Sequence, residues 1–277
     1  ILFICDKICY IFGGDYMEKY DVKFKKKFGQ NFLQDNNIIY KIVDSIGATK
    51  DDLVIEIGSG GGALTKYITK IGCKYLGYEI DTDVKQFLSS YESDDVKFIY
   101  DDFLNRNISD DIQDIKFNNL YIVGNLPYYI TTPIILKIIE ARLNVTNMVF
   151  MVQNEVADRF SAKPKSREYG SISVLMNYFY NIKKLFIVPK KCFYPVPGVD
   201  SAVIGLSTKD DLLEVDFNKF NSLVRNSFQF KRKNLRNNLR SYNLENINNI
   251  LNKHGYSLDN RAEDLPYEVF VDIANNL

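Results

Sequence analysis

The sequence predicts an α/β fold, in which a mostly parallel sheet is followed by a small helical domain. From Asp51 onward, short apolar strands alternate with helical patterns, which is typical of βαβ units. After Ser207 the spacing of apolar residues becomes helical and stays so to Leu277. We therefore expect a sheet domain at residues 17–207 and a helical domain at residues 208–277.

The sheet domain divides into strands and helices in chain order. Residues 53–57 form the first expected strand, which ends at Gly58, and residues 63–71 form a short helix. Strands are further expected at residues 73–80, 96–100, 120–123 and 147–152, and helices at residues 83–91, 132–143 and 154–160. Residues 185–188 and 202–206 flank a proline-rich turn and suit an antiparallel pair at the sheet edge.

The helical domain shows four stretches of helical spacing. They lie at residues 217–228, 231–240, 244–254 and 266–276. The first 16 residues are apolar, but Asp6 and Lys7 interrupt them and they lack the features of a signal peptide. We expect residues 1–16 to be an extension without a role, because the lysine-rich stretch after Met17 reads like a true amino terminus.

Composition excludes few function classes but narrows the cellular setting. The chain has 277 residues, and its 35 basic and 35 acidic side chains cancel, so net charge neither favours nor excludes a nucleic acid. Four cysteines without paired metal spacing indicate reduced thiols in the cytoplasm, and a single histidine argues against a metal site. Because no stretch reaches the roughly 18 apolar residues of a membrane span, we expect no membrane contact.

The most informative motif is Asn125-Leu126-Pro127-Tyr128, which follows an apolar strand. The carboxyl ends of parallel strands are where α/β sheets bind ligands. The Asn125 side-chain oxygen and the Leu126 carbonyl can accept hydrogen bonds from an exocyclic amino group, while Pro127 fixes the turn. Tyr128 offers its ring face to a base. Two acceptors would localise the lone pair of an adenine N6, so the motif predicts an amino-methylation site.

Polar or glycine-rich segments follow the three preceding strands as well. The glycine loop with Gly58 and Gly60 opens a helix, and Glu79 ends the next strand, where a carboxylate can bind ribose hydroxyls. The loop alone would also fit a dinucleotide fold. Asp102 could accept from an adenine amino group or could simply cap a turn. Together with Asn125, these strand ends favour S-adenosylmethionine as the cofactor.

The chain resembles the KsgA-type small-subunit rRNA adenine dimethyltransferases from about Lys25 to its end. The resemblance rests on residues 27–33, 55–60, 78–81, 124–128, 151–156, 168–173, 193–197, 199–203 and 228–235. Several of these pieces are shared with the macrolide-resistance rRNA methyltransferases, whereas residues 162–170 are more similar to the KsgA type. One difference from the family is Ser59 and Gly61, where proline and a larger apolar residue are usual, and it implies a looser loop.

The resemblance implies a class I, Rossmann-like methyltransferase fold with a small helical C-terminal domain. It implies methylation of two adjacent adenosines near the 3′ end of small-subunit rRNA, on a pre-ribosomal particle, by a monomer in the cytoplasm or in an organelle. The family's cofactor contacts fall on Asn31, Leu33, Gly58, Glu79, Asp102 and Asn125. We expect Tyr128 and Phe193 to hold the extruded base between them, although Phe193 could equally pack in the core.

Two basic segments are candidates for RNA contact. Lysines alternate with phenylalanines near the amino end, a pattern suited to backbone charge and stacking. The second segment contains no acidic residue. The candidate residues are Lys25, Lys26, Lys27, Arg225, Lys231, Arg232, Lys233 and Arg236.

Three alternatives remain open from the sequence. The first is a large-subunit rRNA methyltransferase of the resistance type, with the same chemistry at another site. The second is a DNA adenine methyltransferase, which the lack of a separate sequence-reading domain disfavours. The third is a ribosome-assembly factor without catalysis, against which the intact Asn125, Tyr128 and Glu79 argue.

Overall fold

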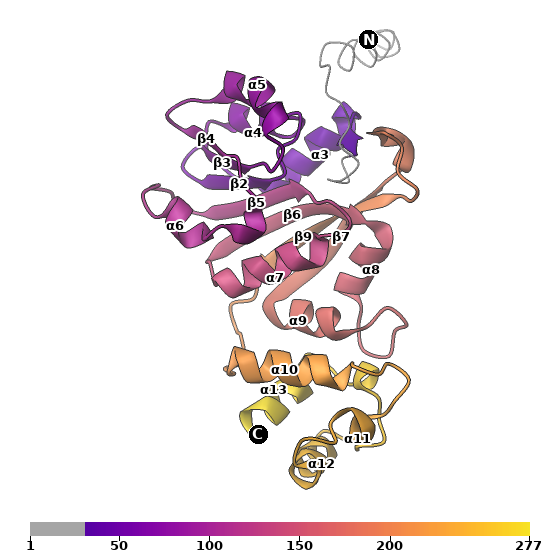
Figure 1. Cartoon of the computed structure of the whole chain (residues 1–277). Helices are drawn as coiled ribbons and strands as arrows, with labels where there is room; N and C mark the ends of the chain where they lie inside the picture. The colour runs from indigo at the N-terminus through magenta and orange to yellow at the C-terminus, as the bar shows by residue number, and fades with distance from the viewer. Residues whose placement is uncertain (1–30) are drawn as a thin grey trace.

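The computed structural model describes residues 31–277 (Figure 1). The expected extension at residues 1–16 and the candidate RNA contacts Lys25, Lys26 and Lys27 lie outside this range. Within the described residues, no helix has the length and apolar character needed to cross a membrane. The same residues contain no cluster of three or more side chains suited to hold a metal ion.

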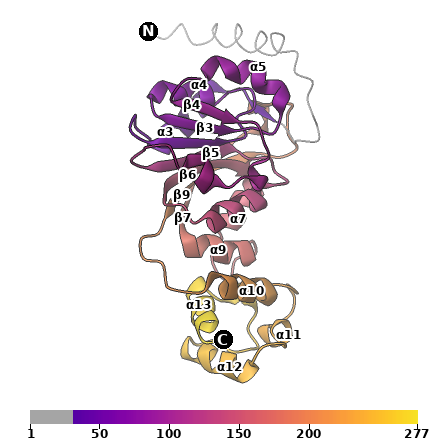
Figure 2. The same cartoon turned by 60° about the vertical axis from the view of Figure 1, so that its left-hand side comes forward.

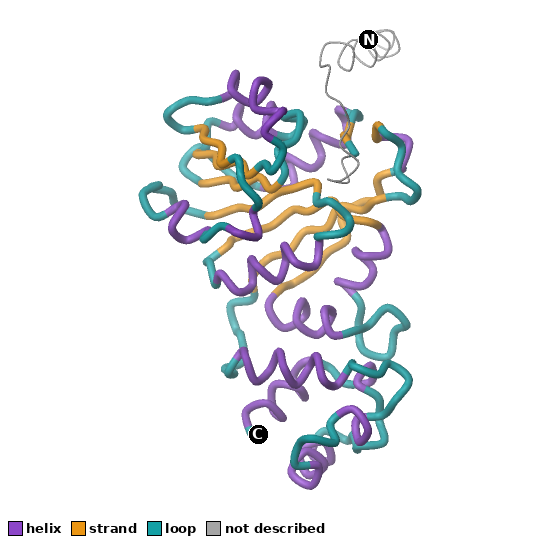
Figure 3. The backbone as a smooth tube through the Cα atoms, viewed as in Figure 1, coloured by secondary structure: helices purple, strands orange, loops and turns teal. Residues whose placement is uncertain are grey.

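A twisted sheet forms the centre of the described chain (Figures 1 and 3). Its strands are β2 (Leu53–Ile57), β3 (Lys74–Tyr78), β4 (Val96–Ile99), β5 (Leu120–Asn125), β6 (Val145–Gln153), β7 (Tyr180–Val188) and β9 (Ser201–Thr208). They are arranged in the order β4–β3–β2–β5–β6–β9–β7. Pairing is parallel from β4 to β6, and β9 runs antiparallel to both β6 and β7. The expected α/β fold with an antiparallel pair at one edge is confirmed.

Helices cover both faces of this sheet. They are α3 (Asn36–Ile46), α4 (Thr65–Ile68), α5 (Lys85–Leu88), α6 (Ile108–Ile112), α7 (Thr131–Ala141), α8 (Asn154–Ser161) and α9 (Ser171–Phe179). In Figure 1, α3 to α5 lie on one side of the strands, and α6 and α7 lie on the other. Two consecutive residues of β2 belong to different hydrophobic core clusters, Val54 to one and Ile55 to the other, because successive side chains of a strand point to opposite faces. Both side chains are buried. This double burial explains the near-continuous apolar runs in the sequence.

A second, two-stranded sheet lies beside the carboxyl ends of the parallel strands. In it, β1 (Phe32–Leu33) pairs antiparallel with β8 (Phe193–Tyr194). Leu33 faces Phe193 in this register. The pairing brings together two segments about 160 residues apart in sequence, and it places the start of the described chain next to the end of β5.

The C-terminal helices form a separate layer, seen at the bottom of Figures 1 and 2. They are α10 (Phe217–Ser227), α11 (Leu235–Asn238), α12 (Leu244–Lys253) and α13 (Tyr267–Asn275). We place the domain boundary at Thr208, where β9 ends. The helical layer does not bury its apolar side chains alone, because Val174 and Tyr178 of α9 share its core cluster with Phe220 and Phe270.

The helix expected at residues 231–240 is much shorter in the structure. Only Leu235–Asn238 is helical within the expected range 231–240. Asn234 is extended, and its side chain accepts the Asn237 N–H, so the helix begins there. The preceding residues are held instead by Asn238, whose side-chain oxygen accepts the Phe230 N–H at 3.1 Å.

Candidate active site

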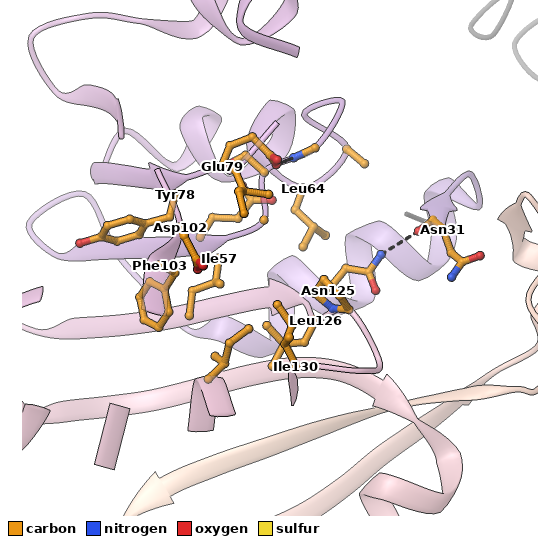
Figure 4. Close-up of a pocket in the computed structure, with 18 of the residues that line it drawn as sticks. Asn31, Ile57, Leu64, Tyr78, Glu79, Asp102, Phe103, Asn125, Leu126 and Ile130 are labelled. Carbon is orange, nitrogen blue, oxygen red and sulfur yellow. Dashed lines mark hydrogen bonds between the residues drawn. The ribbon is translucent and has the colours of Figure 1, made fainter. Parts of the chain in front are cut away.

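A cavity of about 220 Å³ opens at the carboxyl ends of β2, β3, β4 and β5 (Figure 4). Every residue that the sequence proposes for cofactor binding lines it: Asn31, Leu33, Gly58, Gly60, Glu79, Asp102 and Asn125. Apolar side chains form its walls, among them Ile57, Leu64, Phe103, Leu126 and Ile130. The topology explains this meeting, because parallel strands end at the same edge of the sheet.

The glycine loop and Glu79 are joined by hydrogen bonds. Gly60 N–H donates to Glu79 Oε2 at 2.6 Å, and Asp81 N–H donates to Glu79 Oε1 at 2.8 Å. Gly58 and Gly60 have φ angles of 78° and 52°, in the left-handed region that favours glycine. The carboxylate is therefore fixed in the cavity, and these two hydrogen bonds do not use all of its lone pairs.

Asp102 caps a turn and also lines the cavity. Its Oδ1 accepts the Leu104 N–H at 3.0 Å and caps the short helical turn Phe103–Asn105. No described residue donates to its Oδ2, and Asp102 lines the cavity. Capping a turn thus leaves one carboxylate oxygen available to a ligand.

Asn125 ends β5 at the rim of the cavity. Its Nδ2 donates to the Asn31 carbonyl oxygen at 3.0 Å, shown as a dashed line in Figure 4. This bond fixes the amide plane and leaves Oδ1 without a partner among the described residues. The Leu126 carbonyl also accepts no hydrogen bond from the described residues. The Leu126 N–H donates to the Met151 carbonyl, and the turn that follows is closed by the Ile130 N–H, which donates to the Pro127 carbonyl instead. Two open acceptors therefore follow one another along the chain.

Tyr128 is held in place from β9. Its hydroxyl lies 2.7 Å from Ser201 Oγ, and Ser201 is fully buried. Partial burial raises the pKa of the Tyr128 hydroxyl, so it stays protonated and hydrogen-bonded. The Pro127 carbonyl accepts from Thr131 Oγ1 at 3.1 Å and joins the turn to α7. Pro127 and Tyr128 both line the cavity.

Phe193 lies elsewhere. Its side chain is 2% exposed and packs in the core cluster with Leu33 and Ile39, and it does not line the cavity. The geometry therefore favours the core-packing alternative over stacking on a base.

The candidate RNA contacts in the C-terminal layer are all exposed and lie away from the cavity. Arg225 is in the last turn of α10, and Lys231, Arg232 and Lys233 follow it. Arg236 of α11 lies 3.5 Å from Asp259, so one of these cations already has an acidic neighbour.

Comparison with known proteins identifies the family. The sequence model of the family described as ribosomal RNA adenine dimethylase matches residues 21–277. The chain belongs to this family. The ribosomal RNA small subunit methyltransferase A of Mycoplasma mobile is 42% identical over 249 residues, which cover 89% of this chain and 95% of the relative. The enzyme of the same name from Thermotoga petrophila is 40% identical, with 94% of both chains covered.

Solved structures show the same fold. A dimethyladenosine transferase from Plasmodium falciparum superposes with a TM-score of 0.71 at 24% identity, covering 87% of this chain and 95% of its own. The 23S rRNA methyltransferase ErmE superposes with a TM-score of 0.65 at 23% identity, covering 89% and 99%. The Rossmann-like methyltransferase fold implied by the resemblance is confirmed.

The cavity fits S-adenosylmethionine, the methyl donor of this enzyme family. A carboxylate with free lone pairs at the end of β3 suits two ribose hydroxyls. The Cβ-free backbone of the glycine loop allows close approach at the start of α4, and a Cβ on Gly60 would lie 3.4 Å from the Phe32 ring. The open Asp102 Oδ2 suits an amino group, and the apolar walls suit a base.

Among the cavity residues that sequence reasoning missed, Glu56 is buried and acidic. Its signal is an acidic side chain in the middle of the apolar strand β2. Glu56 Oε2 accepts from Tyr75 OH at 2.5 Å and from Thr65 Oγ1 at 2.7 Å. The Tyr75 hydroxyl also lies 3.0 Å from Ser59 Oγ, so this buried network connects Glu56 to the glycine loop. Ser59, expected to loosen the loop, thus has a buried partner.

Burial raises the pKa of Glu56 to about 7, with a further contribution from the charge of Glu79. A carboxyl group whose pKa is raised in the folded state lowers the stability of the protein at pH values above that pKa. It has no such effect at pH values below its pKa in the unfolded chain. Glu56→Gln keeps an oxygen for both donors and removes the charge. We expect it to raise the free energy of unfolding at pH 8 by about 3 kcal/mol, with the gain shrinking as the pH falls from 7 toward 4.5. Urea unfolding of both proteins across this range measures the effect, and an equal gain at pH 4.5 and pH 8 would contradict it.

Proposed function

We propose that this chain dimethylates N6 of two adjacent adenosines near the 3′ end of small-subunit rRNA, within a pre-ribosomal particle. The observation that carries the proposal is the pair of open acceptors, Asn125 Oδ1 and the Leu126 carbonyl, at the rim of the methyl-donor cavity. The relatives from Mycoplasma mobile and Thermotoga petrophila, both named as small-subunit methyltransferases, support the choice of RNA.

The residues of the motif have distinct roles in this proposal. S-adenosylmethionine supplies a methyl group on a positively charged sulfur. Asn125 Oδ1 and the Leu126 carbonyl accept hydrogen bonds from the two N6–H groups, which localises the nitrogen lone pair and orients it toward the donor. The Asn31 carbonyl holds the Asn125 amide in the orientation that presents oxygen rather than nitrogen. Catalysis is then mainly positioning, and the N6 proton leaves to solvent after transfer.

Tyr128 is proposed to stack on the target base. A base must leave its helical stack to reach a cavity of this kind. The hydrogen bond with Ser201 fixes the tilt of the Tyr128 ring beside the cavity, so the stacking face is preorganised. Tyr129 follows it, is 59% exposed and also lines the cavity, which adds a second aromatic surface at the mouth.

Large-subunit methylation is the second candidate, since the structure resembles ErmE. At 23% identity this likeness concerns the fold. We favour small-subunit RNA because relatives of that name are about 40% identical over nearly the whole chain. We further propose that the enzyme acts as a monomer in the compartment where small subunits assemble, the cytoplasm or an organelle. Arg225, Lys231, Arg232, Lys233 and Arg236 are proposed to contact RNA phosphates.

Methyl transfer to purified ribosomal subunits tests the proposed substrate. Small and large subunits from a strain without this modification would be incubated separately with the protein and labelled S-adenosylmethionine. We expect label in small-subunit RNA only. Label in large-subunit RNA alone would contradict this proposal and would indicate a large-subunit rRNA methyltransferase of the resistance type. Donor binding without transfer to either subunit, under conditions in which a related enzyme is active, would contradict catalysis.

A further inference from the structure

The segment between α8 and α9 has no place in the cavity, although it is rich in basic residues. It includes Lys163, Lys165 and Arg167, all of which are exposed. Lys165 has a φ angle of 70°, in the left-handed region that a side chain such as lysine rarely adopts. A strained residue of this kind persists only where the surroundings fix it.

Hydrogen bonds to the C-terminal layer fix this loop. Lys165 N–H donates to the Glu263 carbonyl at 2.8 Å, and Tyr169 OH donates to the Leu265 carbonyl at 3.0 Å. Within the loop, Ser166 Oγ donates to the Lys163 carbonyl at 2.8 Å. The loop backbone is therefore anchored at several points, and it fixes the positions from which the side chains of Lys165 and Arg167 extend.

The anchored loop lies beside the basic segment that follows α10. Lys231 Nζ donates to the Arg167 carbonyl at 3.2 Å, across 64 positions of sequence. Figure 1 shows the α8–α9 loop and the α10–α11 segment close together, on the side of the molecule where β6 enters α8. The ring contact between Tyr169 and Phe228, at 6.1 Å between centroids, joins the same two segments.

Most of the positive charge on this joint surface has no partner. No described residue pairs with the side-chain cations of Lys165, Arg167, Arg232 and Lys233. Lys163, by contrast, bonds the Asn177 side chain, and Arg261 lies 3.6 Å from Glu263. Glu168 is the one acidic residue of the loop. Four exposed, unpaired cations thus remain on a surface formed by two segments.

We propose that the α8–α9 loop is a second RNA-backbone contact, which binds phosphates together with the segment 231–233. This inference rests on the proposed function, and it assigns a role to Lys165 and Arg167, which the active site does not use. Lysine and arginine side chains without acidic partners suit the evenly spaced charges of an RNA backbone. The left-handed turn at Lys165 is consistent with a loop that is shaped for contact rather than for packing.

The test compares two double variants. Lys165→Ala with Arg167→Ala removes the two loop cations, and Lys50→Ala with Lys97→Ala removes two exposed lysines elsewhere, at the turn before β2 and on β4. Affinity for unmethylated small subunits would be measured over a range of salt concentrations. We expect the loop variant to reduce the slope of log affinity against log salt by about 2, since each phosphate contact contributes about 1. The control variant should keep the wild-type slope.

Donor binding and thermal unfolding separate the possible failures. Donor binding should be unchanged in the loop variant because neither side chain lines the cavity, and thermal unfolding should be unchanged because both side chains are exposed. Equal slopes for the loop variant and the wild type would overturn the inference. A loss of affinity for polyglutamate, with RNA affinity unchanged, would do the same and would indicate an acidic protein partner. Failure of the wild type to methylate any subunit would instead reject the proposed function.

Discussion

Asn125→Ala is expected to lower the rate of methyl transfer by about 100- to 1000-fold, which is typical for loss of an oriented hydrogen-bonding group at a reacting atom. The reason is the arrangement of its amide, whose nitrogen bonds the Asn31 carbonyl at 3.0 Å while its oxygen stays open to the cavity. Affinity for S-adenosylmethionine should fall less than about tenfold, because one neutral hydrogen bond contributes roughly 1 kcal/mol. Single-turnover transfer and calorimetric donor binding measure the two effects separately.

Asn147→Ala is the matched control. Asn147 lies on β6, and its side chain also donates to backbone carbonyls, those of Ser45 and Ile46, both at 3.1 Å. It does not line the cavity. We expect this control to lower the melting temperature without lowering the transfer rate. A transfer rate close to wild type in Asn125→Ala would remove this asparagine from the mechanism.

Glu79→Gln should weaken donor binding by about 10- to 100-fold, the range for a hydrogen bond to a charged group. This substitution is not conservative here, because each carboxylate oxygen accepts a backbone N–H, one from Gly60 and one from Asp81. A glutamine amide must turn its own N–H₂ toward one of these donors, whichever way it is oriented. Either Gly60 of the glycine loop or Asp81 would then lose its hydrogen bond, and the ribose would lose an acceptor. Equilibrium titration with the donor measures the loss.

The pH dependence of donor binding gives a second test of Glu79. Burial raises the pKa of this carboxyl, with the Asp81 charge acting in the same direction. Hydroxyl donors of the ligand stabilise the ionised form, so binding should weaken as the pH falls through the raised pKa. The pKa of the neighbouring Glu56 is also raised, to about 7. Donor binding with and without Glu79 should therefore be compared in the Glu56→Gln background. Identical pH profiles with and without Glu79 would contradict its role in the cavity.

The strand ends of the cavity could be predicted from sequence because their physics is local. An apolar strand followed by glycine, Glu79, Asp102 or Asn125 shows which residues reach the edge of the sheet. Parallel pairing then brings these edges together without further information. The antiparallel addition of β7 and β9 could be predicted for a similar reason, since a proline-rich turn separates two apolar runs.

Features that depend on distant partners could not be predicted. Strand β1 has two residues, and only its pairing with β8 places Asn31 where its carbonyl can orient Asn125. Within the expected helix at residues 231–240, the Asn234 cap and the side chain of Asn238 determine that the helix starts only at Leu235. The spacing of apolar residues does not reveal these hydrogen bonds. The sequence pattern likewise leaves the role of Phe193 open, and burial against Leu33 and Ile39 favours packing.

Nucleoside mapping of the methylated RNA tests the central claim most directly. Small subunits lacking the modification would be treated with the protein and unlabelled S-adenosylmethionine, and the 3′-terminal RNA fragment would be digested and analysed by mass spectrometry. We predict N6,N6-dimethyladenosine at two adjacent positions, and its absence with Asn125→Ala. Methyl groups on a base other than adenine, or on adenosines outside the 3′ region, would contradict the account.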